Sequence, residues 1–388
     1  MNIKYLSIIF SCLTLPLFAQ TESILESVEK NNISLRTLRN QLDVQLMENK
    51  TDLTLENPQV AFDYCWGSPS EVGKKRNLTV TQTLDFSKIS GRQRAVANTK
   101  SNLLALQYEM SRREVLKQAE VLCVKLAHNK RMLNHYNALL ADTKRLSETT
   151  KRMMESGTIS SLEHNRALLA YMQASGECKN LALERENLLA ELSLMNGGEP
   201  LSFEGQPCAN GSFEKNFDTL FAQLSQNHPQ LLMADEEVHL GEKTLSMARV
   251  QNIPDLTAGY TGEWTDADRY NGFTLGISLP LWQQKNKVKH ASMARQAAEA
   301  NRQDLQLQKR NELKAIYDRA LMQQSVWEEY QSILSAYQGG ELLDKAFNAG
   351  QINVVDYLSS RSTYYDMVKM VADAEYEYQL SLLELKWW

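Results

Sequence analysis

Two pairs of segments in this chain alternate between apolar and polar residues at every second position. The four segments are residues 58–66, 78–86, 254–264 and 273–281. Successive side chains of an extended chain point to opposite sides, so this alternation is typical of β-strands. Short polar segments separate the members of each pair. The pattern therefore predicts two β-hairpins, at residues 58–86 and 254–282.

The length and the aromatic residues of these hairpins are typical of membrane strands. Each strand has roughly 10 residues, about what a tilted strand needs to cross the hydrocarbon layer of a bilayer. Aromatic side chains on the apolar faces gather toward one end and predict a girdle at the membrane interface: Tyr64, Trp66, Tyr260 and Trp264. For one hairpin alone, a soluble hairpin with one face packed on a core is the favoured interpretation. The second copy favours the membrane.

Helix-forming segments lie on both sides of the first hairpin. Residues 22–56 lack glycine and proline and predict one helix. Residues 92–155 predict a much longer helix, with apolar residues repeating every seven positions as in a coiled coil. Gly157 marks a turn, and a returning helix runs from an expected cap at Ser161 to Met195.

The second half of the chain repeats this order of elements. Pro254 corresponds to Pro58 and Gly350 to Gly157, at nearly constant spacing. Residues 285–348 predict the second long helix, in which the glycine pair at 339–340 predicts a local bend or bulge, or else a break. We interpret the pattern as an internal duplication. The predicted repeats span residues 20–205 and 206–388.

The amino terminus has the pattern of a secretory signal peptide. A positively charged start is followed by a short apolar run that ends at Ala19, too short for a spanning helix. Residues 1–19 are therefore expected to be removed. A lipoprotein signal that uses Cys12 is the less favoured alternative.

Composition and hydropathy narrow the ways in which the chain can enter a membrane. Its mean hydropathy is −0.42, and no apolar run of about 18 residues follows the amino terminus. Four strands are too few to close a barrel, and open edges are costly in lipid. Several copies must therefore combine their strands. Small polar residues on the other faces predict a water-filled conduit, with helices in the periplasm and hairpin loops outside.

Other function classes find little support in the sequence. The net charge of −5 argues against nucleic acid as a partner. The five cysteines show no metal or disulfide pattern, and His128 and His135 lie seven positions apart rather than three or four. No catalytic set or phosphate loop is present. The chain is expected to be no enzyme and to hold neither a cofactor nor a metal.

The duplicated plan, the hairpin endings at 82–86 and 277–281, and the turns at 157–163 and 350–356 resemble the TolC-like outer membrane efflux proteins. The resemblance implies a mainly α fold with a small membrane β part, in which long coiled-coil hairpins and two β-hairpins per chain form a trimeric α-barrel/β-barrel tunnel. It also implies a homotrimer in the outer membrane, extending into the periplasm, with an adaptor (membrane fusion) protein and an inner membrane pump as partners.

The same resemblance implies functional residues near the two helical turns. Asp356 and Glu163 lie where the family carries acids that narrow the periplasmic entrance, although a second family acid is Ser359 here. Both acids also suit the first turn of a helix, and the two roles are compatible. The expected adaptor contacts are the turn residues Gly157, Thr158, Ile159, Gly350, Gln351 and Ile352.

The function expected from these observations is a passive exit duct of a tripartite efflux system. It would carry metal ions, drugs or other small solutes from the periplasm to the outside. One alternative is the same architecture serving type I protein secretion. Another, from a different class, is a periplasmic coiled-coil adaptor or scaffold without a barrel.

Overall fold

The computed structural model describes residues 18–69, 73–205, 213–280, 282, 284–337 and 339–388. The predicted signal peptide therefore lies almost wholly outside the described residues. The chain divides into two compact units. The first comprises Met1–Arg36, Arg112–Phe221 and Asn311–Trp388, and the second comprises Thr37–Ser111 and Ala222–Arg310.

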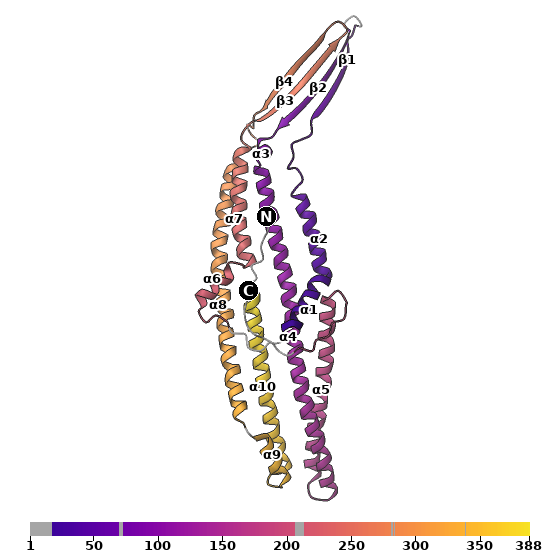
Figure 1. Cartoon of the computed structure of the whole chain (residues 1–388), viewed down its shortest axis with the longest axis vertical. Coiled ribbons are helices and arrows are strands. Elements are labelled where there is room, and N and C mark those ends of the chain that lie inside the picture. Colours follow the sequence, from indigo (N-terminus) through magenta and orange to yellow (C-terminus); the bar gives the residue numbers. More distant parts are fainter. Residues whose placement is uncertain (1–17, 70–72, 206–212, 281, 283, 338) are drawn as a thin grey trace. The chain divides into compact units, whose positions relative to one another are not determined.

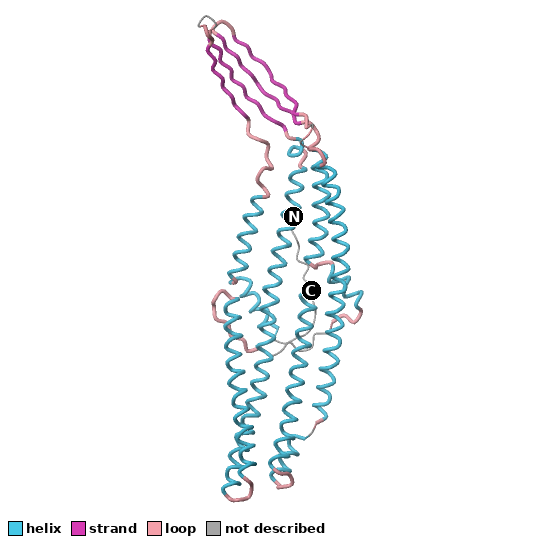
Figure 2. Tube along the Cα trace, turned by 180° about the vertical axis from the view of Figure 1, so that it is seen from behind, coloured by secondary structure: helices cyan, strands magenta, loops and turns pink. Residues whose placement is uncertain are grey.

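The second unit contains one antiparallel sheet of four strands, in the order β1-β2-β3-β4 (Figures 1 and 2). The strands are β1 (Gln59–Trp66), β2 (Lys74–Leu84), β3 (Asp255–Thr265) and β4 (Arg269–Ser278). Both predicted hairpins are confirmed. The two hairpins join through β2 and β3, which pair along their length although they are far apart in the sequence.

Two strands begin earlier than the alternation predicts. β2 starts at Lys74, inside the expected loop, where the Lys74 N–H donates to Asp266 Oδ2 of the other hairpin at 2.9 Å. β4 starts at Arg269 because Thr265 and Asp268 close a tight turn, with a Thr265 N–H to Asp268 carbonyl distance of 2.9 Å. Contacts between and within the hairpins thus extend the strands beyond their apolar residues.

Helices make up most of the remaining described chain. Their bounds are α1 Phe18–Asn31, α2 Ile33–Glu48, α3 Phe86–Ile89, α4 Arg92–Glu155, α5 Ser161–Met195, α6 Phe217–Ser225, α7 Pro229–Val250, α8 Lys287–Ala336, α9 Gly339–Asn348 and α10 Val354–Trp387. The predicted long helix at 92–155 and the returning helix ending at Met195 are confirmed. Among the described residues, no helix combines the length and the apolarity that a membrane crossing requires.

Three helix predictions need correction. The single helix expected over residues 22–56 is two helices that end at Glu48. Asn32 interrupts them, because its side-chain oxygen accepts the Leu35 N–H at 2.9 Å and its amide donates to the Met195 carbonyl at 2.7 Å. The helix expected over 285–348 starts at Lys287 and breaks between Ala336 and Gly339. Of the stated alternatives the break is thus the one observed, and both glycines lie at the start of α9.

The third correction concerns the cap of the returning helix, which is Ser160 and not Ser161. Ser160 and Glu163 form a capping box, in which the hydroxyl of Ser160 accepts the Glu163 N–H and the carboxylate of Glu163 accepts the Ser160 N–H. The box requires the partner acid three positions after the cap, with two residues between them. This spacing selects Ser160.

The first unit has a hydrophobic core where three helices meet. Its buried side chains come from α1, α4, α5 and the segment after α5: Ile24, Val28, Ala119, Leu122, Cys123, Leu126, Ala127, Leu188, Leu192 and Phe203. In the same unit α10 packs against both α5 and α9. The two helical hairpins, α4–α5 and α9–α10, therefore lie side by side within one compact unit.

Candidate functional site: the sheet faces and the helical turns

One face of the sheet is apolar and uncovered. A row of cross-strand neighbours crosses all four strands on this face, from Val60 to Val80, Tyr260 and Phe273. Phe273 is 90% exposed and Leu275 is 84% exposed. Soluble monomers rarely expose contiguous apolar patches larger than a few hundred Å². The face therefore requires a partner other than water.

The opposite face of the same sheet is polar. Three cross-strand contacts lie on it: Thr83 Oγ1 to Thr257 Oγ1 at 3.2 Å, Thr261 Oγ1 to Thr274 Oγ1 at 2.9 Å, and Lys75 Nζ to Glu263 Oε2 at 2.9 Å. Small hydroxyl groups and charges that face one another in this way suit contact with water. The sheet thus separates an apolar environment from an aqueous one.

The predicted girdle residues lie on the apolar face. Tyr64, Trp66 and Trp264 are close to the hairpin loops, whereas Tyr260 lies near the middle of β3, level with Val80 and Phe273. Trp66 pairs with Lys74 and is 75% exposed, and Tyr64 is 44% exposed. Tyr260 is 41% exposed, and its hydroxyl donates to Asn271 at 2.8 Å. Trp264 covers Gly262, where a side chain would lie only 2.8 Å from the indole ring. The positions of Tyr64, Trp66 and Trp264 fit one girdle, whose role stays a prediction, and Tyr260 lies two cross-strand rows away from it.

The two turns between long helices share one backbone geometry. Gly157 and Gly350 have φ angles of 75° and 68°, which L side chains rarely adopt. The residue after each glycine donates its N–H five residues back, from Thr158 to Met153 at 2.8 Å and from Gln351 to Ala346 at 2.9 Å. This pattern is a Schellman-type helix end. Both turns are therefore sharp and specified by glycine.

The expected adaptor contacts differ in exposure. Gly157, Thr158, Gly350 and Gln351 are exposed, whereas Ile159 is half-buried. Ile352 packs against a small core beside the turns that contains Leu146, Ala167 and Tyr357. The glycines and polar residues are thus available to a partner. Ile352 mainly holds the two hairpins together.

The two candidate gate acids both lie in the first turn of a helix. Asp356 is exposed, its N–H donates to Asn353 Oδ1, and its carboxylate accepts from Asn353 Nδ2, both at 2.8 Å. The N–H and hydroxyl of Ser160 hold the pKa of Glu163 below its ordinary value. Each acid therefore stabilises a helix start in the single chain. A role at an entrance is compatible with this geometry and stays a prediction.

A polar cluster that the sequence did not indicate ties the two hairpins together. Arg361 of α10 pairs with Asp142 of α4 and lies 3.8 Å from Asp344 of α9. The hydroxyl of Tyr365 donates to Asp142 at 2.7 Å, and that of Tyr357 donates to Asp344 at 2.6 Å. We call these five residues the cross-tie. The Arg361 side chain is only 14% exposed, so its charge depends on these partners.

Burial and hydrogen bonding shift the pKa values of the cross-tie. Burial alone would raise the pKa of Asp142, but hydrogen bonds from Arg361 and Tyr365 outweigh it and lower that pKa. Burial and the hydrogen bond to Asp344 raise the pKa of Tyr357 to about 12. At neutral pH Asp142 is therefore ionised, and the phenol groups of Tyr357 and Tyr365 are neutral.

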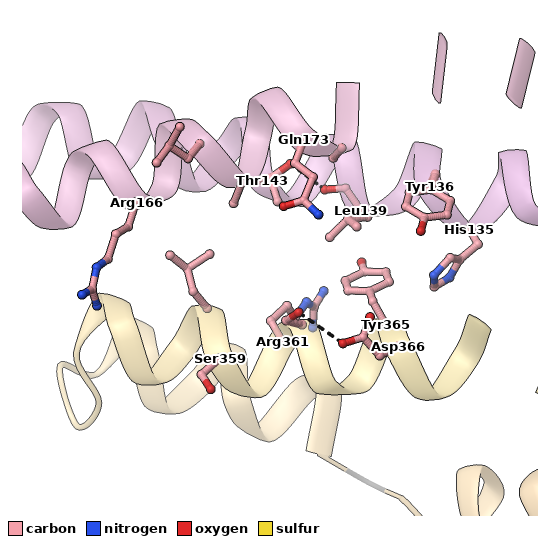
Figure 3. A pocket seen from close by; sticks show the side chains of 15 residues that line it. His135, Tyr136, Leu139, Thr143, Arg166, Gln173, Ser359, Arg361, Tyr365 and Asp366 are labelled. Atoms are coloured by element: carbon pink, nitrogen blue, oxygen red, sulfur yellow. Dashed lines mark hydrogen bonds between the residues drawn. The ribbon is translucent and has the colours of Figure 1, made fainter. Parts of the chain in front are cut away.

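A groove of about 430 Å³ lies beside the cross-tie, between the α4–α5 hairpin and α10 (Figure 3). His135 and Tyr136 face Tyr365 and Asp366 across it. The rings of His135 and Tyr365 are 5.1 Å apart. Farther along α4, His128 stacks on Tyr376 at 4.6 Å and its Nε2 lies 3.3 Å from Asp373. Both histidines thus act in helix packing, and the described residues contain no cluster of three potential metal ligands.

The missed cross-tie left almost no signal in the sequence. Asp142 and Arg361 are 219 positions apart, so no local spacing connects them. The tyrosines fall on helix faces that also suit apolar packing. Only the position of an arginine on the inner face of α10 could have indicated a buried partner.

Comparison with known proteins supports the family suggested by the residues. The sequence model of the outer membrane efflux protein family matches residues 220–386. Outer membrane protein TolC of Vibrio cholerae is 26% identical over 229 residues, which cover 52% of this chain and 52% of that protein. The match thus spans about half the length of this relative. The family is one of channels rather than enzymes.

Solved structures share the fold. A membrane protein from Pseudomonas aeruginosa superposes with a TM-score of 0.76 at 14% identity, covering 95% of this chain and 92% of that one. The Campylobacter jejuni CmeC outer membrane channel gives a TM-score of 0.69 at 15% identity, with 95% and 85% covered. The predicted fold class, mainly helical with a small membrane sheet, is confirmed. The comparisons support a TolC-like outer membrane efflux family, whose listed members are outer membrane channels.

Proposed function

We propose that this protein is the outer membrane channel of a tripartite efflux system and acts as a passive exit duct for metal ions, drugs or other small solutes. The observation that carries the proposal is the sheet with one uncovered apolar face and one polar face. Lipid suits the first face and a water-filled lumen suits the second. The match to the family model supports the same assignment.

The outer strands of the sheet support assembly with further copies. Within the part of the chain that the structure describes, β1 and β4 each pair on one side only. Unpaired backbone groups are costly in lipid, so the edges must join strands of other subunits. Three copies would give twelve strands, a permitted number for an outer membrane barrel. We therefore propose a homotrimer, built from the two predicted repeats of residues 20–205 and 206–388.

The turns at Gly157 and Gly350 are the proposed docking points of a periplasmic adaptor, which would connect the channel to an inner membrane pump. They cap the helical hairpins and present exposed backbone and polar groups. Around a three-fold axis, Asp356 and Glu163 would each form a ring of three carboxylates at the entrance. Such rings attract cations and repel one another. The passage would thus be narrow and cation-selective at rest.

Planar bilayer recording of the purified mature protein tests the proposal. We expect discrete conductance steps from a trimer, and block by divalent cations that weakens in Asp356→Asn. Glu148→Gln, at an exposed acid of α4, is the matched control and should leave the block unchanged. A monomeric, freely soluble protein without conductance would contradict the channel. Unchanged block in Asp356→Asn would contradict only the gate.

A deletion strain tests the class of substrate. Increased susceptibility to metals or drugs, restored by the wild-type gene, is the expected result. Loss of a secreted protein without any change in susceptibility would instead assign the duct to protein export.

A further inference from the structure

Positive charge gathers where the helices of the second unit meet the sheet. Residues 86–108, 243–254 and 279–298 contain ten lysines and arginines and no aspartate or glutamate, in a chain whose net charge is −5. Seven of these side chains lie closest to the strand ends. We call them the basic collar: Lys88, Arg92, Arg94, Arg249, Lys285, Lys287 and Lys289.

The structure brings the segments of the basic collar together. Arg92 at the start of α4 donates to Ser246 of α7 at 2.6 Å, and α3 packs against α7. A hollow lined by α7 and the start of α8 includes Lys285 and Lys287. The basic collar therefore extends over four helices, α3, α4, α7 and α8, at the helical end of the sheet, away from the hairpin loops (Figure 1).

The charges of the basic collar are exposed and largely unused within the chain. All seven residues except the half-buried Lys88 are exposed, and among the described residues none of the seven forms an ion pair. The nearest acid in the sequence, Asp85, accepts hydrogen bonds from the N–H and hydroxyl of Ser87 and caps α3. Asp255 and Glu56 lie near Asp85 at this end of the sheet, but among the described residues none of these three acids forms an ion pair with the collar.

Four of the seven charges stand where a helix disfavours them. Arg92 and Arg94 lie in the first turn of α4, and Lys287 and Lys289 lie in the first turn of α8. A helix start carries partial positive charge and favours acids, yet neither first turn contains one. Basic residues here oppose helix stability, so they indicate an external anionic partner.

Apolar side chains identify the kind of partner. Close to the basic collar, Trp282 is 81% exposed, Leu279 62%, Ile89 53% and Ile253 46%. Tryptophan beside lysine and arginine at the edge of an apolar surface is typical of a membrane interface. The apolar face of the sheet begins at the same place. The pattern fits a surface that enters a headgroup layer more closely than one that binds a soluble protein.

We infer that the basic collar binds the anionic phospholipid headgroups of the leaflet that faces the helices. Phosphates there would neutralise the lysines and arginines, while Trp282 anchors the boundary. The contact would fix the depth of the sheet in the bilayer. The inference rests on the proposed function, because it requires the sheet to be inserted with its helical end toward the periplasm.

Lipid selectivity of the reconstituted full chain tests this inference. The probe is phosphatidylglycerol against phosphatidylethanolamine in mixed vesicles, with preferential association measured by spin-labelled lipid. The triple variant Lys285→Gln, Lys287→Gln, Lys289→Gln is compared with a matched triple variant of exposed lysines in the first unit, Lys125→Gln, Lys144→Gln, Lys179→Gln. We expect a wild-type preference for phosphatidylglycerol that falls as salt is added.

The collar variant should lose about fivefold in preference for each charge removed at low salt, and the control variant should lose none. Equal preference in wild type and collar variant, with normal conductance in both, would overturn the inference while leaving the channel intact. A changed ion selectivity with unchanged lipid preference would also overturn it, because the lysines would then line the lumen. Failure of the wild type to insert at all would instead overturn the proposed function.

Discussion

The sheet of the second unit and the cross-tie of the first unit distribute polarity in opposite ways. The sheet exposes its large apolar side chains, with Leu275 84% accessible, whereas the cross-tie encloses an arginine that is 14% accessible. A water-soluble fold would bury the former and expose the latter. The difference shows that the two regions are suited to different environments. The sheet is adapted to an apolar solvent, and the cross-tie to a contact between helices.

The largest effect is expected from a charge on the apolar face of the sheet. Leu275→Lys should cost about 2–4 kcal/mol of folding free energy in lipid vesicles, because an ammonium group near the bilayer midplane loses its hydration. Thr274→Lys is the control at the same depth on the polar face and should cost much less. Urea titration of both variants in vesicles measures the difference. Equal costs would mean that the two faces do not meet different solvents.

The sequence predicts which residues lie on each face of a hairpin, but it does not predict how the two hairpins pair with each other. Alternation over 254–264 and 273–281 identifies both faces of a hairpin, because a strand has a fixed period of two. The pairing of β2 with β3 was not contained in that pattern. It depends on contacts such as Lys75 with Glu263, which join residues far apart in the sequence.

Helix ends likewise show which features the sequence can predict and which depend on tertiary contacts. The glycines at 157 and 350 predicted both turns, because few other residues adopt a positive φ. The break at Asn32 was missed, since asparagine interrupts a helix only when its side chain finds partners, here the Leu35 N–H and the Met195 carbonyl. Local residue preferences thus locate turns made by glycine. They do not locate those made by tertiary hydrogen bonds.

The next largest effect concerns the cross-tie. Arg361→Ala should destabilise the first unit by about 1–3 kcal/mol. The partly buried Asp142 loses its least exposed cationic partner but keeps the hydrogen bond from Tyr365 and the more exposed Arg145 at 3.5 Å, and the pair is only partly shielded from solvent. Chemical denaturation followed by circular dichroism measures the loss. Arg152→Ala, at an exposed position of α4, is the control and should cost little.

A double-mutant cycle sharpens this prediction. If the cross-tie acts as one cluster, Asp142→Asn combined with Arg361→Ala should cost clearly less than the sum of the two single variants. Additive costs would show that the two side chains stabilise the helices independently. The cross-tie would then not be the element that joins the hairpins.

Smaller effects on stability, of about 1 kcal/mol and opposite in sign, are expected from replacing two glycines of the same helical hairpin by alanine. Gly157→Ala should destabilise, since its φ of 75° is unfavourable for any residue with a Cβ. Gly176→Ala lies within α5, where a Cβ would meet nothing within 4 Å, and should stabilise by a similar amount. Thermal unfolding of both variants tests the pair. Destabilisation by both would show that α5 needs Gly176 for a close approach that the single chain does not contain.

The smallest expected effect is the pH dependence of the stability that the cross-tie contributes. It distinguishes the contribution of the Asp142 charge from that of side-chain packing. The folded-state pKa of Asp142 is lowered below its ordinary value of 3.8, so its contribution to stability is present above that pH and disappears as the pH falls through the folded-state value. Asp142→Asn should therefore be less stable than wild type at pH 7 and should approach it in stability as the pH drops below 3.8. Denaturation curves of both proteins across this range measure the convergence. If the gap between wild type and Asp142→Asn stayed constant with pH, the cluster would hold the hairpins by shape and hydrogen bonding alone. The burial of Arg361 would then need another compensating charge.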